Sequence, residues 1–383
     1  MTAGRDAWLA LALTPGIGPD RFARLVARFE TPLGALSAPF ALLGTVPGIS
    51  RAAATSLDRQ TPDAGARVRR EVERMGGRCL LPPDPEFPEI LKTIPQPPTM
   101  LFSRGNLELL SRPAIAIVGS RDHSDYGREV ARAVARCAAR AGVVVVSGMA
   151  RGLDAEAHAA ALEAGGGTIG VLGNGLGVIY PAANRSLYRA VAEQGLLLTE
   201  FPPGDRPHAG SFPRRNRIIS GLARVTVVAE AASGSGTLIT VEAALEQGRD
   251  VMAVPGPITS PTSVGTNRLI GDGAHPLLVP GDLLRFYDGV LPATCPPVSA
   301  PAPAPAPAAG RISTGPGLEP ASTAPDLEPR EARLYGALGR APVHLDVLAE
   351  TLRRPVAEVL DGLCALELAG LVEQRPGRLF VRL

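Results

Sequence analysis

With 383 residues, 45% of them hydrophobic, the chain is long enough for two or three domains with buried cores. Its formal net charge is only +2, so no overall field attracts nucleic acid, and any anion binding must come from local clusters. Lys92 is the one lysine, which excludes a GxxxxGK nucleotide-binding loop and leaves no plausible lysine for a Schiff base.

The cysteines and histidines give no sign of a metal site or a disulfide framework. The four cysteines are scattered without paired spacing, and the five histidines form no HExxH or similar ligand pair. The sequence shows neither a cationic leader with a long apolar run nor an uninterrupted apolar stretch of about 18 residues. We therefore expect a soluble, cytoplasmic protein of a reducing compartment, without a bound metal.

Residues 1–75 are predicted to form an all-α domain of the helix-hairpin-helix (SAM-like) kind. The segment TPGIGP at 14–19 lies between two amphipathic segments, and a related segment, TVPGIS, follows at 45–50. Such a turn exposes the unpaired N–H groups of its second helix, which can bind a DNA phosphate. The same turn also serves for packing alone, so both interpretations stay open. Ser50 replaces the second glycine and makes the second hairpin the weaker candidate.

Residues 76–112 are interpreted as a mixed connector between domains. Short strands are expected at 79–81 and 101–105. The proline-rich segment 82–98 between them disfavours regular structure.

Residues 113–290 alternate apolar runs with helical segments. Helices are expected at 126–141, 154–164, 184–194 and 237–247, and the apolar runs lie at 115–118, 143–146, 168–172, 196–198, 225–229 and 251–254. Strands buried on both faces that alternate with helices predict an α/β domain, a Rossmann-like, doubly wound, mostly parallel sheet.

Glycine-rich turns follow four of these strands, at 119–121, 147–151, 173–175 and 233–237. Doubly wound sheets bind ligands beyond the carboxyl ends of their strands, so we expect these turns to meet at one edge. A glycine turn before a helix can direct several backbone N–H groups at one anion. None of the turns has the GxGxxG spacing, so no dinucleotide cofactor is expected.

A cluster of arginines precedes the strand at 225–229. Five of them, Arg206, Arg214, Arg215, Arg217 and Arg224, lie between Asp205 and that strand. Together with the glycine turns, they point to a polyanion, and Phe212 beside them could stack on a base. Because aromatic residues make up only 4% of the chain, binding should depend on phosphates, with little sequence preference and a strong salt dependence. The alternative is a solvated helix face or a structural ion-pair network.

The remaining chain is predicted to be a linker followed by a small domain. Residues 291–325 include a strict Ala-Pro alternation at 300–307, which favours extended polyproline II. Within 326–383, three helical segments precede two short strands around a Pro-Gly turn, a winged-helix pattern. Acidic and basic residues are nearly balanced there, which favours an accessory or protein-contact role over base readout. Double-stranded DNA remains a possible partner of this domain and of the hairpins.

The order of the central motifs is similar to that of the DNA-processing protein A (DprA/Smf) family. The motifs are IVGSR at 117–121, SGMARGLD at 147–154, GNG at 173–175 with YP at 180–181, FPRRNRIIS at 212–220, SGT at 235–237 and AVPG at 253–256. This resemblance implies a non-enzymatic protein that binds and protects incoming single-stranded DNA during natural transformation and loads the RecA recombinase. It also implies a homodimer formed through the Rossmann-like domain, without a cofactor.

The glycine turns and arginines that match the family motifs are the candidate DNA-binding residues. The resemblance implies a lysine near Asn184 in other members, where this chain has Arg185, and it places the dimer and RecA contacts toward residues 269–278. The candidates are Gly119, Ser120, Arg121, Ser147, Gly148, Arg151, Asn184, Arg185, Phe212, Arg214, Arg215, Asn216, Arg217, Ser235, Gly236 and Thr237.

An enzymatic alternative starts from the loop at 233–237. It is similar to the GGxGTxxE loop of nucleotide phosphoribohydrolases, whose glutamate helps to cleave an N-glycosidic bond. Here Thr240 occupies the glutamate position, and Glu242 lies about 200° further round the helix. The acid that this chemistry needs is therefore missing from its expected place. A pocket that senses a small nucleotide is a third interpretation.

Overall fold

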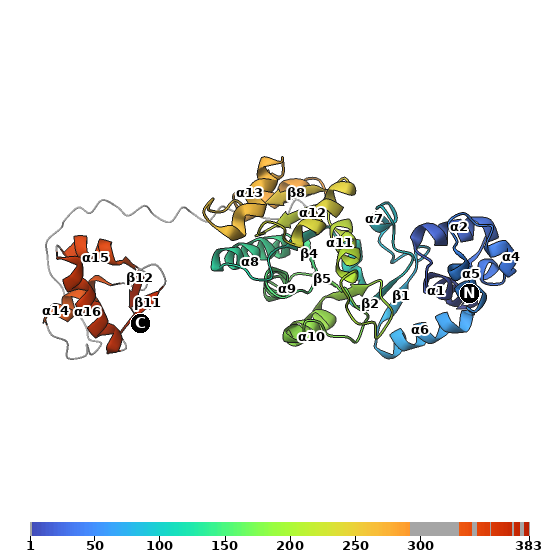
Figure 1. Ribbon diagram of the computed structural model, residues 1–383, viewed down its shortest axis with the longest axis horizontal. Coiled ribbons are helices and arrows are strands. Elements are labelled where there is room, and N and C mark those ends of the chain that lie inside the picture. The colour runs from blue at the N-terminus through green and yellow to red at the C-terminus, as the bar shows by residue number, and fades with distance from the viewer. Residues whose placement is uncertain are drawn as a thin grey trace. The chain divides into compact units, whose positions relative to one another are not determined.

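The computed structural model describes residues 2–291, 329–338, 343–352, 354–369, 371–375 and 379–382. The chain divides into two compact units, Met1–Ala306 and Pro307–Leu383 (Figure 1). The first contains the N-terminal helices and the large sheet, and the second contains the winged-helix elements. The predicted polyproline segment at 300–307 lies outside the described residues.

The N-terminal helices form two hairpins around one apolar core. The Pro-Gly turns predicted from the repeat are both present, with Gly16 and Gly48 at φ of 84° and 83°, a conformation that favours glycine. Arg21 donates to the Gly16 carbonyl at 2.6 Å, and Arg24 donates to the Pro47 carbonyl at 3.0 Å. The helices are α1 (Thr2–Ala12), α2 (Pro19–Phe29), α3 (Pro32–Leu36), α4 (Phe40–Leu43), α5 (Arg51–Asp58) and α6 (Pro62–Arg74).

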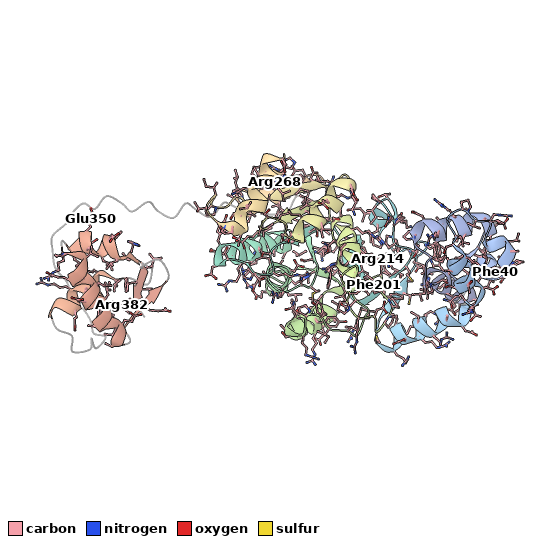
Figure 2. The ribbon with its side chains drawn as sticks, viewed as in Figure 1. Phe40, Phe201, Arg214, Arg268, Glu350 and Arg382 are labelled. Atoms are coloured by element: carbon pink, nitrogen blue, oxygen red, sulfur yellow. The ribbon has the colours of Figure 1, made fainter. Side chains whose placement is uncertain are left out.

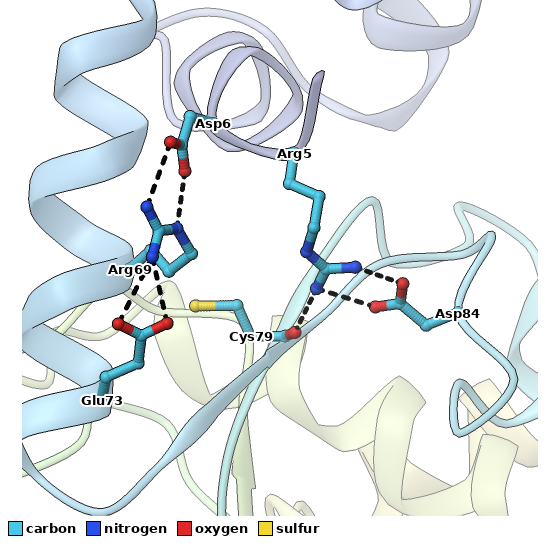
Figure 3. Close-up of polar contacts among 6 residues, drawn as sticks. All are labelled: Arg5, Asp6, Arg69, Glu73, Cys79 and Asp84. Atoms are coloured by element: carbon cyan, nitrogen blue, oxygen red, sulfur yellow. Dashed lines mark hydrogen bonds and ion pairs between the residues drawn. The ribbon is translucent and has the colours of Figure 1, made fainter. Parts of the chain in front are cut away.

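Ion pairs and a shared core fix these helices to the large sheet. Arg5 on α1 pairs with Asp84 and donates to the Cys79 carbonyl at 2.8 Å (Figure 3). Arg69 on α6 pairs with Asp6 of α1 at 2.7 Å. Apolar residues of α1 and α6 pack in the same cluster as strand residues of the sheet, which joins the helical module to the rest of its unit.

The large sheet has nine strands in the order β1-β2-β6-β5-β4-β3-β7-β8-β9. The pairings from β6 through β9 are parallel, whereas β1 and β2 are antiparallel additions at one edge. The short strands expected at 79–81 and 101–105 therefore extend this sheet. Its strands are β1 (Arg78–Leu80), β2 (Leu101–Gly105), β3 (Ala114–Val118), β4 (Val144–Ser147), β5 (Thr168–Val171), β6 (Leu196–Thr199), β7 (Val225–Val228), β8 (Asp250–Ala253) and β9 (His275–Pro276).

Helices cover both faces of the sheet, as predicted for a doubly wound fold. Alternate residues of β3 enter different cores: Ile115 and Ile117 pack with α8 and α9, while Ala116 and Val118 pack with α11 and α12. The helices are α7 (Glu89–Lys92), η1 (Leu107–Ser111), α8 (Asp125–Arg140), α9 (Leu153–Glu163), η2 (Ala182–Asn184), α10 (Arg185–Gln194), α11 (Ser211–Leu222), α12 (Thr237–Glu246), η3 (Pro261–Ser263), α13 (Val264–Gly271) and η4 (Pro280–Tyr287).

The second unit has the predicted winged-helix fold, with a three-stranded sheet in the order β10-β12-β11. Leu334, Leu348, Leu363 and Phe380 are buried in its core. The expected Pro-Gly turn at 376–377 lies outside the described residues. The elements are α14 (Pro329–Ala337), β10 (Val343–His344), α15 (Leu345–Leu352), α16 (Val356–Leu368), β11 (Val372–Arg375) and β12 (Leu379–Arg382). Across the described parts of both units, no helix has the length and apolarity needed to span a membrane.

Candidate nucleic-acid interface

The four glycine-rich turns meet at the carboxyl edge of the parallel strands. A cavity of about 470 Å³ is lined by the turns after β3 and β7, and an adjoining cavity of about 290 Å³ by the turns after β4 and β5. The two cavities share Arg121, Ala150, Phe212 and Arg215. The strand order reverses between β3 and β7, so the larger cavity lies at the topological switch point, where doubly wound folds bind ligands.

A buried arginine, Arg215, forms the floor shared by the two cavities, and the buried Asp154 carboxyl group lies near it in the larger one. Arg215 donates to the carbonyls of Gly148 and, at 2.7 Å, Val171, and burial lowers its pKa to about 10. Asp154 lies close enough to oppose that shift and accepts from the backbone N–H of Gly148 at 3.1 Å. Any side chain at Gly148 would collide with the Arg215 guanidinium, which explains the glycine there.

An exposed arginine and two aromatic rings line the opening above this floor. The Arg121 guanidinium carbon lies 5.5 Å from the Phe212 ring centroid, and Tyr180 lies 5.9 Å from the same ring. Tyr180 is 47% exposed and Phe212 is half-buried. This arrangement combines a cation for phosphate with flat surfaces for base stacking.

The N-terminus of α12 closes the other side of the larger cavity. Ser235 Oγ accepts from the Thr237 N–H at 3.3 Å and donates to Thr237 Oγ1 at 3.1 Å. Gly236 precedes the helix, and a Cβ there would meet nothing within 4 Å, so space remains beside the first-turn N–H groups. With Arg121 on the same cavity wall, this helix end is suited to an anion.

Two known sequence families match this chain. The family described as "DNA recombination-mediator protein A" matches residues 78–288, and the "DprA winged helix domain" matches residues 318–378. The chain belongs to the DNA recombination-mediator protein A family. It is 34% identical to "Protein Smf" of Synechocystis over 98% of both chains, and 41% identical to "Protein Smf" of Escherichia coli over 79% of this chain and 77% of the other.

Solved structures of the family share the fold. DNA processing protein A from Streptococcus pneumoniae aligns with a TM-score of 0.64 and 32% identity, over 76% of this chain and 98% of that one. DNA processing protein A from Helicobacter pylori, described for its single-stranded DNA binding mode, aligns with a TM-score of 0.52 and 28% identity over 56% and 97%.

Within this family fold, the arginine run of α11 is directed mostly inward, in contrast to the expectation that it lines the pocket as a set. Arg215 is buried, and Arg217 is 12% exposed and pairs with the buried Glu200 at 2.5 Å. Arg214 is exposed but lies over the Phe201 ring at 5.3 Å, outside the lining of both cavities (Figure 2). The alternative interpretation, a structural ion-pair network, therefore holds for Arg217.

Several other candidates shape the turns rather than present a polar group. Ser147 is buried and donates to the Ile117 carbonyl at 2.6 Å, and the Ser120 hydroxyl donates to the Asp122 carbonyl at 2.6 Å. Asn216 is buried and accepts from Arg215 at 3.1 Å. Asn184 donates to the carbonyls of Met149 and Ala150, at 3.0 and 3.1 Å, and so holds the turn after β4.

Arg121 and Arg151 are the exposed candidate arginines that line the cavities. Arg151 lines the smaller cavity, and its ion pair with the exposed Asp122 at 3.1 Å is weak because solvent screens it. Arg185 is exposed at the start of α10 but belongs to the lining of neither cavity. Gly119 lines the larger cavity with its backbone, since a Cβ there would collide with Leu153.

Two residues with clear roles were not among the candidates. Tyr180 was visible in the family motif, and its ring completes the aromatic surface. Glu230, buried at the end of the β7 run, accepts from the N–H and hydroxyl of Ser124 at 2.9 and 2.7 Å and from Thr262 at 2.5 Å. It joins the N-terminus of α8 to the loop before α13, and no sequence spacing revealed those partners.

Proposed function

We propose that this protein is a single-stranded DNA-binding recombination mediator that protects incoming single strands and loads the RecA recombinase during natural transformation and homologous recombination. The observation that carries the proposal is the meeting of Arg121, Phe212, Tyr180 and the α12 N-terminus at the switch-point edge of the sheet. Family membership and the described DNA binding of the Helicobacter pylori protein support it.

In this proposal, phosphates bind at Arg121, Arg151 and the first turn of α12, and bases stack on Phe212 and Tyr180. Arg185 adds a phosphate contact on the outer side of the smaller cavity. Backbone contacts carry no sequence information, so the protein binds single strands of any sequence. Each arginine that neutralises a phosphate contributes about 0.7 to the dependence of log affinity on log salt concentration for a single strand.

We assign a role to each of the predicted domains. Residues 113–290 hold the DNA, residues 326–383 serve as an accessory or protein-contact domain, and residues 1–75 support the sheet with hairpins that can contact a DNA backbone. The linker at 291–325 connects residues 113–290 to residues 326–383. We include a cytoplasmic location, a homodimer through the Rossmann-like domain, and the absence of catalysis in the proposal. The contacts for self-association are placed toward residues 269–278, where Leu278 is 73% exposed.

The lining of the larger cavity supports binding over cleavage of nucleotides. Thr240 lies in the lining where phosphoribohydrolases carry a catalytic glutamate. Glu242 is exposed and is outside that lining. Incubation with nucleoside monophosphates should release no free base, and base release would favour the enzymatic alternative.

A titration of fluorescent oligo-dT tests the DNA-binding part. Arg121→Ala combined with Arg151→Ala should weaken binding at least tenfold at about 0.15 M salt, where the screening length is about 8 Å. Arg140→Ala, an exposed arginine on α8 with no ion pair among the described residues, is the matched control. Unchanged binding by the double variant would refute the assignment. RecA loading is tested separately, by following RecA filament formation on strands covered with single-strand-binding protein, with and without this protein.

A further inference from the structure

A second large cavity lies at the opposite edge of the sheet, where the parallel strands begin. Its volume is about 1110 Å³, larger than either cavity at the carboxyl edge. The amino ends of β3, β7 and β8 line it through Ala114, Arg224 and Arg249. Residues of the connector close its other side. Nothing in the proposed DNA path uses this cavity.

Two arginines lie side by side in this cavity. Val225 pairs with Asp250 in the parallel register of β7 and β8, so Arg224 and Arg249, one residue earlier on each strand, are neighbours across the sheet. Neighbouring strands are about 4.8 Å apart, and residues at the same register point to the same face. The two guanidiniums are therefore held near each other by the backbone.

Within the described residues, neither Arg224 nor Arg249 forms an ion pair with a carboxylate. Asp250, the nearest acid in sequence, pairs with His275 at 3.5 Å instead. Glu86 and Glu89 also line the cavity but pair with Arg78 and Lys92, at 3.1 and 2.5 Å. Glu108 on η1 is the remaining acid of the lining. The cavity therefore has an excess of positive charge.

Arg249 is also short of hydrogen-bond partners. Its Nε–H is buried and has no acceptor among the described residues, although unpaired buried donors are costly. Burial and the charge of Arg224 both lower the pKa of Arg249. Since arginine stays charged in proteins, an anion between the two guanidiniums would offset their repulsion and accept from the unpaired Nε–H.

We propose that this cavity binds a small phosphate monoester, with the phosphate held by Arg224 and Arg249 and an apolar body against Leu110 and Leu222. A phosphate dianion balances both guanidiniums at once, whereas a single carboxylate leaves one of them uncompensated, and guanidinium forks match phosphate oxygens. The volume exceeds that of inorganic phosphate, and apolar lining residues offer a surface to the rest of the ligand.

The test uses the full-length protein and deoxythymidine monophosphate, followed by calorimetry and by broadening of its phosphorus NMR signal. Because the carboxyl-edge cavities can also hold a nucleotide, the measurement is made in an Arg121→Gln, Arg151→Gln background. We expect one bound nucleotide in this background, and about tenfold weaker binding after Arg224→Gln. Arg224→Lys should bind more tightly than Arg224→Gln but less tightly than the background protein, because lysine keeps the positive charge but lacks the planar guanidinium that donates two parallel hydrogen bonds.

Arg224 is exposed, so its replacement by glutamine leaves the fold intact, and Arg140→Gln is the matched control that should change nothing. Arg224→Gln alone should also leave oligo-dT binding unchanged, which separates this site from the proposed DNA interface. The proposal is overturned if the background protein binds no nucleotide or if Arg224→Gln binds it as tightly as Arg140→Gln does.

Discussion

Replacement of Arg215 by methionine should destabilise the protein strongly. Methionine keeps much of the side-chain length but removes the guanidinium that bonds to the carbonyls of Gly148 and Val171. It also leaves the Asp154 carboxylate buried without its cation. Removal of one partner of a directly paired buried ion pair costs about 3–5 kcal/mol, and here the bonds to two buried carbonyls are lost as well, so we expect a loss of unfolding free energy of about that size.

A second substitution, Asp154→Asn, tests whether the uncompensated charge of Asp154 causes the destabilisation by Arg215→Met. The double variant Arg215→Met, Asp154→Asn leaves no buried charge without an opposite charge nearby. Its loss of unfolding free energy should therefore be smaller than the sum of the two single losses, by about 1 kcal/mol or more, as for other coupled pairs. Denaturant titration can follow Trp8, the one tryptophan, which packs against the core shared by the N-terminal helices and the sheet. A cost below about 1 kcal/mol for Arg215→Met, or additive costs, would refute the reasoning.

The pH dependence gives a second check with a defined sign. Burial raises the pKa of Asp154, and the Arg215 charge opposes that rise. Without Arg215, the folded-state pKa of Asp154 should be raised further. A group with a raised folded pKa stabilises the fold below its unfolded pKa, and this stability is lost as pH rises through the folded pKa. Arg215→Met should therefore be less destabilising near pH 5 than near pH 8.

Four further outcomes follow from the same structure. Loss of Arg121 and Arg151 together should reduce the salt slope of oligo-dT binding by about 1.4, which titrations at several salt concentrations measure. Arg217→Met should lower stability in denaturant titration, because the buried Glu200 loses its closer cation and keeps only the exposed Arg214 at 3.5 Å, while that salt slope stays unchanged. Glu230→Ala should cost about 1–3 kcal/mol in the same titration and speed hydrogen exchange around residues 120–128, since three donors lose their acceptor. Deletion of residues 326–383 should leave most of the single-strand affinity intact in a gel-shift titration, and a large loss would contradict the accessory role of the winged helix.

Much of the fold was predictable because its signals are local. Each central strand is an apolar run buried on both faces, and four of the runs lead into glycine-rich turns, so the alternation indicated both the parallel sheet and the edge where the turns meet. The antiparallel addition of β1 and β2 was not predictable in the same way. These two strands join the sheet through pairs of residues that are far apart in sequence, such as Phe102 with Thr199. The sequence of a short strand does not indicate which strand it pairs with.

The meeting of the glycine-rich turns at one edge was predicted from the sequence, whereas the direction of single side chains was predicted less well. A glycine turn reveals where the backbone bends, but whether Ser147 points to solvent or to the Ile117 carbonyl depends on a strand 30 residues away in sequence. Tyr180 lines the smaller cavity and its ring lies 5.9 Å from that of Phe212. Neither the spacing nor the composition of the sequence reveals that the two rings are close.

Helix geometry explains why the arginine run is not the main cation source of the interface. At about 100° per residue, Arg214 and Arg217 are about 60° apart on α11, while Arg215 points about 100° away from Arg214. Arg214 and Arg217 therefore face the same carboxylate, Glu200, at 3.5 and 2.5 Å, and Arg215 turns to the cavity floor. The run contributes mainly to the scaffold. The proposed phosphate contacts are then made by the loop arginines, Arg121 and Arg151, so we expect the salt slope to distinguish them from Arg217.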